Sequence, residues 1–330
     1  MKLHARAPGV ALSLAAAGVS YAVSRVVPGA SALLVAIVLG VVLTNVVRLP
    51  AAVTPGTDFA AKRLLRAGIV VLGLQVAVGD ILALGAPMLL VVVCIVAGGI
   101  GGTWVLGRWL GVPPGLRLLV ACGFSICGAA AVAATAGVID PDDEAEQDTI
   151  TAVALVVMCG TLMIAALPAL AHLMGMDPHT TGMWAGGAVH EIAQVVAVGG
   201  IVGGGALTVA VIVKLARVLM LAPVMAVVSV RRRRAATSAG SAGVRPPVVP
   251  LFVAGFVAMV VLRSVVTLPA PILTAASTVQ TALLASAMFA LGCGVRVAAL
   301  ARVGPRPFAL AGLSTVWVAG IALLGVTVCA

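Results

Sequence analysis

Long apolar runs dominate this sequence and decide what it can fold into. Eleven stretches of about 16 to 25 residues contain few charged side chains, and short polar segments separate them. A hydrocarbon core about 30 Å thick needs about 20 apolar residues per helix, so stretches of this length are expected to cross a membrane. The expected spans cover residues 10–27, 31–47, 64–79, 88–107, 116–138, 149–171, 181–202, 206–229, 250–268, 273–297 and 307–329.

Composition supports an all-α transmembrane bundle and excludes other classes. Only 9% of the 330 residues are charged, whereas soluble domains carry about 25%. A transmembrane β-barrel would need strands of about ten residues with alternating polarity, and these runs do not alternate. We therefore expect one integral membrane domain over residues 1–330, in which small residues such as the 38 glycines let helices pack closely.

The basic residues indicate an orientation. If the N-terminus is cytoplasmic and eleven spans alternate, sixteen of the twenty Lys and Arg residues lie on the cytoplasmic side and only two outside. The positive-inside rule favours this arrangement, which leaves the C-terminus outside the inner membrane. The basic loop 231–247 is then cytoplasmic and close to anionic lipid. The acidic segment 140–148 falls outside, where we interpret it as a solvated turn, with a cation site as the alternative.

Two cations fall near the middle of an apolar span, where insertion scales assign about 2.5–3.5 kcal/mol to each charge. Lys214 and Arg217 lie three residues apart on one face of span 206–229. Two cations together at this depth would attract an anion, so we interpret them as substrate-binding residues. A structural ion pair with an acidic residue of the preceding span is the alternative.

A second polar cluster lies in the preceding span, 181–202. Glu191 is almost at its centre, beside His190 and one turn before Gln194. A charged group at this depth usually faces a cavity or a partner. We interpret the three side chains as a coupling or ion-pair site, and a structural hydrogen bond between two helices is the alternative.

A glycine-containing segment, CGFSICGAAAV, lies inside span 116–138. Gly123, Ser125 and Gly128 are candidates for a break in the helix. A helix that breaks inside the membrane offers N–H groups and a positive dipole end to an anion. Close packing of small residues against a neighbouring helix is the alternative.

The spans also suggest an internal repeat. If the first span is an extra helix, the remaining spans form two halves, about 31–171 and 181–330. An offset of five helices reverses orientation, so the halves would be inverted repeats in which span 116–138 matches span 273–297. A rival alignment matches residues 64–85 with 283–304 at a constant shift of 219.

Four segments together resemble the YeiH family, bacterial membrane proteins labelled sulfate exporters. They read KRLLRAGIVVLGLQ, CGFSICGAAAV, GGAVHEIAQVVAVG and KLARVLMLAPV, and the likeness runs from about Ala61 to the C-terminus. The resemblance implies the fold of the bile-acid, arsenite and riboflavin transporter group, with two inverted five-helix repeats and broken, crossing helices. The glycine, His-Glu and Lys-Arg residues named above occupy the motif positions that this resemblance implies.

These features predict a secondary carrier that moves a small anion, such as sulfate or another sulfur oxyanion, by alternating access. A cation-coupled uptake carrier for an organic anion, a passive anion channel and an intramembrane enzyme are the alternatives. The sequence lacks GxxxxGK[ST], HExxH and GxSxG motifs, so we expect no enzyme activity, metal or cofactor. Basic residues lie at span ends and not in one patch with aromatics, which argues against nucleic acid. The coupling ion, proton or sodium, and a homodimeric state are left open.

Overall fold

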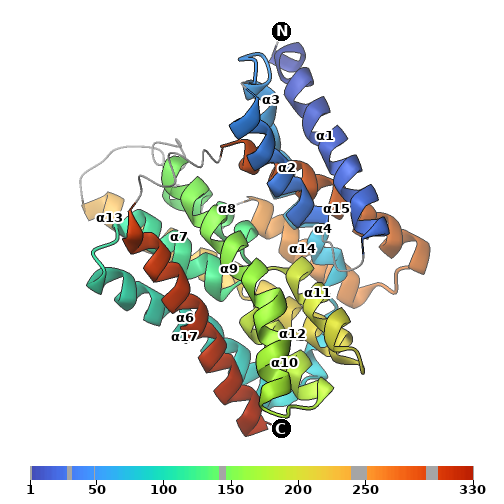
Figure 1. Ribbon diagram of the computed structural model, residues 1–330, viewed down its shortest axis with the longest axis vertical. Helices are drawn as coiled ribbons and strands as arrows, with labels where there is room; N and C mark the ends of the chain where they lie inside the picture. Colours follow the sequence, from blue (N-terminus) through green and yellow to red (C-terminus); the bar gives the residue numbers. More distant parts are fainter. Residues whose placement is uncertain are drawn as a thin grey trace.

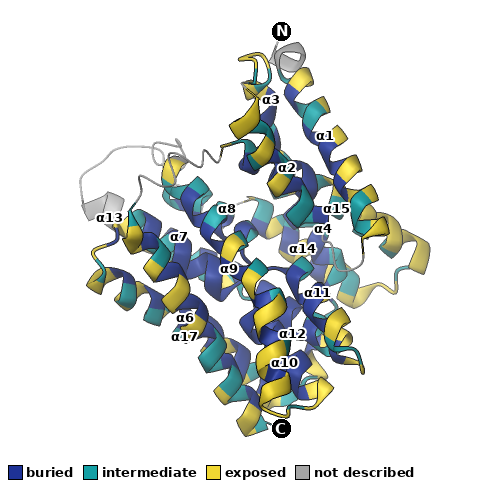
Figure 2. Ribbon diagram, in the orientation of Figure 1, coloured by how far each residue is buried: buried dark blue, intermediate teal, exposed yellow. Residues whose placement is uncertain are grey.

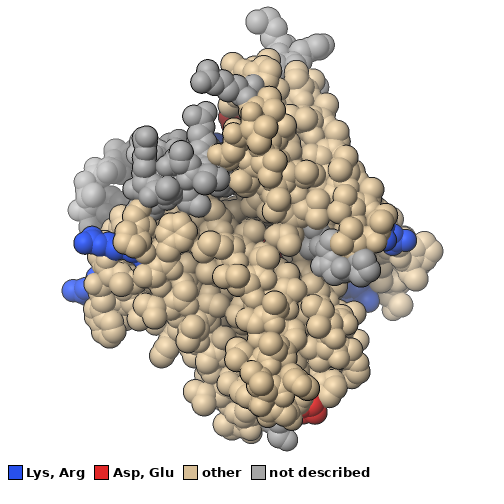
Figure 3. All heavy atoms as spheres, viewed as in Figure 1, with Lys and Arg blue, Asp and Glu red and all other residues tan. Residues whose placement is uncertain are grey.

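A computed structural model gives the architecture of the chain and describes residues 2–27, 32–47, 49–140, 146–238, 251–294 and 304–329. Every regular element in these ranges is a helix (Figure 1). Among the described residues, six helical segments are long and apolar enough to cross a membrane, and several shorter apolar helices accompany them. The chain is therefore a polytopic membrane bundle, as composition predicted. One face of the molecule is almost free of charge (Figure 3).

One group of helices, here called the scaffold body, packs around a single central helix, α15 (Ala270–Gly294). Gly40 and Gly292 lie where α2 and α15 cross, and a Cβ at either position would collide with the backbone of the other helix. Glycine therefore sets this close approach. The helices that contact α15 are α1 (Lys2–Val26), α2 (Ala32–Val46), and the segment α3 (Thr54–Phe59), η1 (Ala60–Leu64), α4 (Leu65–Leu72) and η2 (Gly73–Gln75). The last member of this body, α14 (Leu251–Val265), packs on α4 and η2.

The remaining helices form a second group, the hairpin body, which carries the residues of the candidate site. The short helix α5 (Val78–Leu82) connects the two groups along the chain. The hairpin body contains α6 (Gly85–Trp109), α7 (Pro114–Ser125), α8 (Ala129–Ile139), α9 (Glu146–Leu173), α10 (Pro178–Ala188), α11 (Ile192–Val202), α12 (Ala206–Leu219), α13 (Leu221–Ser238) and α17 (Pro305–Cys329).

The end of the bundle where α6 finishes is rich in arginine and is here called the arginine end. Gly107 packs against the side chain of Arg117, and Gly111 lies beside the guanidinium of Arg306. Arg232 of α13 donates a hydrogen bond to the Val138 carbonyl, at the end of α8. The opposite end of the bundle is called the distal end.

Helices α7 and α8 form a helical hairpin, hairpin 1, that enters and leaves at the arginine end. A Cβ on Gly115, at the start of α7, would lie 3.3 Å from the Asp148 carboxylate at the start of α9. Since α9 follows α8 after a few residues, the start of α7 and the end of α8 lie at the same end of the bundle. The chain reverses after Ser125, where Gly128 has φ 75°, a conformation that glycine adopts readily.

Helices α10 and α11 form a second helical hairpin, hairpin 2, that enters and leaves at the distal end (Figure 1). Gly204 packs against Pro178, so the start of α10 lies beside the start of α12. Gly199, near the end of α11, packs against Leu207 at the same place. The chain reverses at Val189 to Glu191, both of which have extended backbone conformations.

Each hairpin is followed by a long helix that starts at the same end, and the two units point in opposite directions. Hairpin 1 is followed by α9, which runs from the arginine end to the distal end, where hairpin 2 begins. The arms have 11 or 12 residues and rise about 16–18 Å, which is about half of a 30 Å hydrocarbon core. The two tips therefore meet near the middle of the bundle.

These hairpins correct the predicted topology. Spans 116–138 and 181–202 do not cross as single helices, because each chain segment turns back at its midpoint. The acidic segment consequently starts and ends at the arginine end, beside Asp140 and Asp148, and not at the opposite end as expected. Residues 141–145 of that segment lie outside the described residues, as do residues 239–247 of the basic loop.

The predicted match between span 116–138 and span 273–297 also fails in one respect. Helix α15 is continuous from Ala270 to Gly294, so the second interrupted element is hairpin 2. Gly292 serves close packing against Ile37 of α2 instead of a break. The inverted units seen here are the two hairpins with their following helices.

Candidate functional site at the hairpin tips

The two hairpin tips contact each other through the Glu191 carboxylate. Its Oε1 accepts a hydrogen bond of 2.9 Å from the N–H of Ala129, the first residue of α8. The same side chain accepts from the N–H of Gln194, whose own Oε1 accepts from the Glu191 N–H at 3.2 Å. This reciprocal pair is a capping box for α11. One carboxylate thus lies at the positive ends of the second arms of both hairpins.

Lys214 of α12 connects the first arms of the two hairpins. Its Nζ donates to the carbonyl oxygen of Ile126 at 2.8 Å and to that of Val189 at 2.9 Å. The side chain is fully buried. Carbonyl groups at the C-terminal end of a helix carry a partial negative charge, which a cation stabilises.

Arg217, one turn further along α12, makes the same kind of contact with more groups and is also fully buried. Its planar guanidinium spreads five donors in a fixed fork, which suits the crowded ends of α7 and α10. The accepting carbonyls are those of Ser125 at 3.2 Å, Phe124 at 2.9 Å, Gly186 at 3.1 Å, Gly187 at 2.7 Å and Val189 at 3.0 Å. Lys214 and Arg217 therefore clamp the first arms, while Glu191 caps the second arms.

His190 anchors the tip of hairpin 2 to its neighbours. Its Nδ1 lies 3.3 Å from the Phe124 carbonyl oxygen and its Nε2 lies 3.1 Å from the Thr315 hydroxyl of α17. Its ring also packs on the Phe124 ring, with centroids 4.5 Å apart. Gln194 donates to the Val157 carbonyl of α9 at 3.4 Å. These contacts position the tips inside the body that carries them.

The predicted glycine and serine positions of hairpin 1 serve its geometry. Gly123 packs against Val132 of the second arm, and a Cβ on Gly128 would overlap the side chain of Glu191. The Ser125 hydroxyl faces Gly99 of α6 and has no hydrogen-bond partner among the described residues. Only backbone groups of this segment therefore meet the buried cations.

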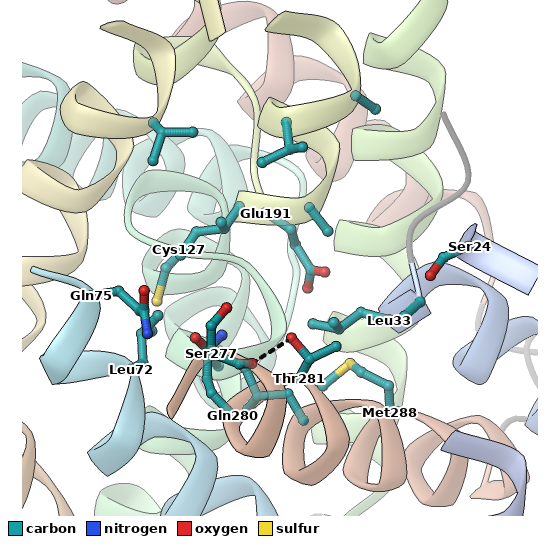
Figure 4. Close-up of a pocket in the computed structure, with 18 of the residues that line it drawn as sticks. Ser24, Leu33, Leu72, Gln75, Cys127, Glu191, Ser277, Gln280, Thr281 and Met288 are labelled. Atoms are coloured by element: carbon teal, nitrogen blue, oxygen red, sulfur yellow. Dashed lines mark hydrogen bonds between the residues drawn. The ribbon is translucent and has the colours of Figure 1, made fainter. Parts of the chain in front are cut away.

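A cavity of about 870 Å³ lies between the hairpin body and the scaffold body (Figure 4). Glu191 and Cys127 point into it from the two tips, toward the Ser277, Gln280 and Thr281 region of α15. The cavity reaches Ile201, near the end of α11, so it extends from the tips toward the distal end. Figure 2 shows the tips buried in the centre of the molecule, with exposed residues on the outer faces.

The cavity wall is largely apolar and contains few polar groups. Glu191 is the one side chain with a formal charge among the described residues that line it. Gln75 of η2 also lines it, and its amide nitrogen is buried without a hydrogen-bond partner in the described structure. An apolar cavity with a few convergent polar groups is the usual form of a small-molecule site.

The buried charges at the tips do not cancel. Lys214 and Arg217 are two fully buried basic side chains, and Glu191 is the buried carboxylate beside them. With all three ionised, the cluster has an excess of one positive charge. No salt bridge to Glu191 occurs within the described ranges, where each charge is bonded to backbone groups instead. Because an uncompensated buried charge is costly, the excess positive charge favours a second anion nearby.

The eight predicted site residues all lie at or beside the two tips, but they differ in whether they line the cavity. Glu191 lines the cavity, whereas Lys214 and Arg217 lie behind the tip carbonyls. No group of three metal-binding side chains occurs in the described part of the chain. Sequence reasoning missed Cys127 and the polar residues from the scaffold. The polar residues from the scaffold are Gln75, Ser277, Gln280 and Thr281. The sequence feature that could have indicated them is a polar side chain inside an apolar span.

Comparison with known proteins identifies the family of the chain. A family model described as Conserved hypothetical protein 698 matches residues 8–311. The chain belongs to this family. The match confirms the resemblance that the four motifs indicated.

Its relatives in this family are UPF0324 membrane proteins. The chain is 56% identical to the one from Corynebacterium glutamicum, over 96% of this chain and 91% of the relative. It is 39% identical to the one from Pseudomonas aeruginosa, over 94% and 90%, and 34% identical to one from Bacteroides thetaiotaomicron, over 87% and 86%. No solved structure matches the chain.

Proposed function

We propose that this member of the UPF0324 family is a secondary carrier that moves a small anion by alternating access. The observation that carries the proposal is the meeting of two oppositely directed hairpins at a buried charge cluster beside a cavity of about 870 Å³. Helices interrupted inside a membrane expose backbone groups that bind solutes or ions. Such backbone is tolerated only where protein or a cavity satisfies it.

The charge balance at the tips supports an anionic substrate. Two buried basic side chains lie behind the tips, which carry one buried carboxylate, and the first turns of α8 and α11 reach the cavity at Ala130 and Ile192. Both helix N-termini add positive potential at that wall. The unpaired amide nitrogen of Gln75 offers a donor from the opposite wall. Sulfate or another sulfur oxyanion is the substrate class that we propose.

The two bodies supply the moving parts. The large cavity reaches toward the distal end, while a small cavity of about 60 Å³ lies toward the arginine end, lined by Arg66, Gly137 and Ile150. Both lie between helices of the scaffold body and helices of the hairpin body. A shift of one body against the other would close the first cavity and enlarge the second, which is alternating access.

The positive-inside rule assigns the sides of the membrane in this proposal. The arginine end is cytoplasmic, so the large cavity opens to the outside. The N-terminus is then cytoplasmic and the C-terminus outside. The fully buried side chains of Phe124 and Ile126 occupy the tip region, which favours a carrier over a passive channel.

Counterflow in proteoliposomes tests the proposal. Vesicles loaded with unlabelled sulfate are diluted into trace radiolabelled sulfate, with the membrane potential held at zero. A carrier gives saturable uptake that depends on internal sulfate and is absent from protein-free vesicles. Unsaturable flux would indicate a channel. Absence of counterflow with sulfate, sulfite, thiosulfate and methanesulfonate would refute the proposed function.

A further inference from the structure

We infer that the Glu191 carboxylate holds the place of the transported anion and takes up a proton when that anion binds, so that anion and proton cross together. This inference rests on the proposed carrier function and adds the identity of the coupling ion. Its basis is the position of one buried carboxylate between two hairpin tips and a cavity.

Glu191 already binds the backbone N–H groups that an incoming anion would use. Its side chain is 8% exposed, and that exposure faces the cavity. Its carboxylate accepts the N–H groups of Ala129 and Gln194, at the starts of both second arms. A substrate anion that reached these N–H groups would lie against a second negative charge. Two anions that share one site cannot both remain ionised without a large repulsion, so one of them takes a proton.

The charge count gives the stoichiometry. With Lys214, Arg217 and Glu191 all ionised, this buried cluster has an excess of one positive charge. Once Glu191 is protonated, the excess becomes two, which a divalent anion such as sulfate neutralises. One proton on the carboxylate per divalent anion therefore leaves the buried site without net charge. The proton bonds to a carboxylate oxygen and returns to water when the anion leaves.

Of the ionisable groups around the tips, Glu191 is the one that is placed to exchange a proton. Lys214 and Arg217 of α12 donate hydrogen bonds to the tip carbonyls, and His190 is held between Phe124 and Thr315. The thiol of Cys127, from the other tip, lines the same cavity. The residues that α1, α2, α4, η2 and α15 contribute to the cavity carry no formal charge; the polar ones are Tyr21, Ser24, Gln75, Ser277, Gln280 and Thr281.

The same contacts argue for a proton and against sodium. A sodium site at an interrupted helix uses the carbonyl oxygens that its C-terminal end exposes. Here Lys214 and Arg217 already bind the carbonyls at the ends of α7 and α10, from Phe124 to Ile126 and from Gly186 to Val189. Two tethered cations thus take the place that sodium would occupy, and the coupling falls to the carboxylate on the other side of the tips.

Sulfate binding and transport at several pH values test the inference in wild type, Glu191→Gln and Glu191→Asp. Asp80→Asn is the matched control, since Asp80 is an exposed carboxylate outside the cavity. In wild type, sulfate should stabilise the purified protein more strongly as pH falls, with up to about a tenfold change in apparent Kd per pH unit for one proton. Glu191→Gln should bind sulfate with no pH dependence, while Asp80→Asn should follow wild type.

Transport gives the second readout. At zero membrane potential, an inward gradient of one pH unit should drive wild type to accumulate sulfate up to about tenfold, with one proton entering per sulfate. Replacement of the sodium in the assay buffer should leave the extent of sulfate accumulation unchanged. Glu191→Gln should exchange sulfate without accumulating it, and Glu191→Asp should keep the response to the gradient.

Each outcome decides one of the two claims. If Glu191→Gln keeps wild-type pH dependence in the binding assay or still accumulates sulfate with the gradient, the coupling inference is overturned while the carrier function stands. The same holds if wild-type binding and accumulation do not respond to pH. If wild type shows neither stabilisation nor counterflow with any of the anions tested, the carrier proposal itself fails. If Glu191→Gln misassembles, the coupling inference is decided by the pH dependence of wild type and by the response of Glu191→Asp to the pH gradient.

Discussion

Replacement of Arg217 by glutamine should destabilise the protein strongly because of the carbonyls that it leaves without donors. Phe124 and Val189 keep His190 and Lys214 as second partners. The carbonyls of Ser125, Gly186 and Gly187 lose their side-chain donor among the described residues. Each buried acceptor left unpaired costs about 1–3 kcal/mol, so three would cost about 3–9 kcal/mol. Local relaxation reduces this, so we expect a loss in the lower half of that range, about 3–5 kcal/mol.

The thermal midpoint of the purified protein, followed by the fluorescence of its four tryptophans, measures this loss. Since about 1 kcal/mol shifts the midpoint by about 2–4 °C in domains of 150–250 residues, we expect a fall on the order of 10 °C. Arg217→Lys keeps the charge but loses the planar fork of donors, so its thermal midpoint should lie between those of wild type and Arg217→Gln. Arg231→Gln, an exposed arginine of α13, serves as the control and should change little. An Arg217→Gln midpoint equal to that of wild type would refute the role of the clamp.

Three further predictions address the tips, the topology and the cap of hairpin 2. Gly128→Ala should cost about 1–3 kcal/mol, because the backbone there has φ 75° and ψ −136°, and it should slow counterflow at least tenfold by displacing Glu191. Gly101→Ala, at a position with open space around it, should not. With a cysteine at Met174 or Asp140, an impermeant maleimide applied to intact cells should label position 174 and spare position 140; the opposite pattern would support eleven alternating spans. Hydrogen bonds from Thr180 and His179 lower the pKa of Asp177, so its stabilising effect should be present at neutral pH and disappear as pH falls through that lowered pKa. The midpoint difference between wild type and Asp177→Asn should therefore shrink in acid, and a constant difference would contradict the cap.

The sequence predicted the membrane class and the chemically important positions because both depend on local composition. Apolar runs of bilayer length and charges at mid-span depth can be read without knowledge of packing. The prediction of a helix break near Gly128 followed from glycine in an apolar run, and the structure confirms it. Glu191 was likewise found by its depth alone.

The sequence could not reveal that the chain turns back at the two breaks. No Lys or Arg occurs between Arg117 and Lys214, so the charge rule has no information about the side on which the intervening loops lie. Two hairpins in that interval cancel each other in the alternation of spans, so the described Lys and Arg residues at the helix ends lie at the same ends of the bundle, relative to one another, as eleven alternating spans would place them. The acidic segment, which carries no basic residue, was the part that was misplaced.

Long-range contacts limited the rest of the prediction. Lys214 and Arg217 were predicted to bind a substrate, and the sequence could not show that both side chains also donate hydrogen bonds to carbonyls 25 to 93 residues away in the chain. The sequence gives no means of counting those acceptors. For the same reason, the sequence could not show that Gln75 and Glu191 line one cavity, since the two residues lie in separate bodies.

Accessibility of Cys127 tests alternating access at the hairpin tips most directly. This thiol lines the cavity beside Glu191, and a variant that keeps Cys127 while the other five cysteines become serine isolates its reaction with an impermeant, charged thiosulfonate. Alternating access requires labelling from the outer face that sulfate slows, and labelling from the cytoplasmic face only when sulfate allows the protein to cycle. Labelling from both faces at once regardless of sulfate, or from neither face of protein that transports sulfate, would contradict a carrier built on these two hairpins.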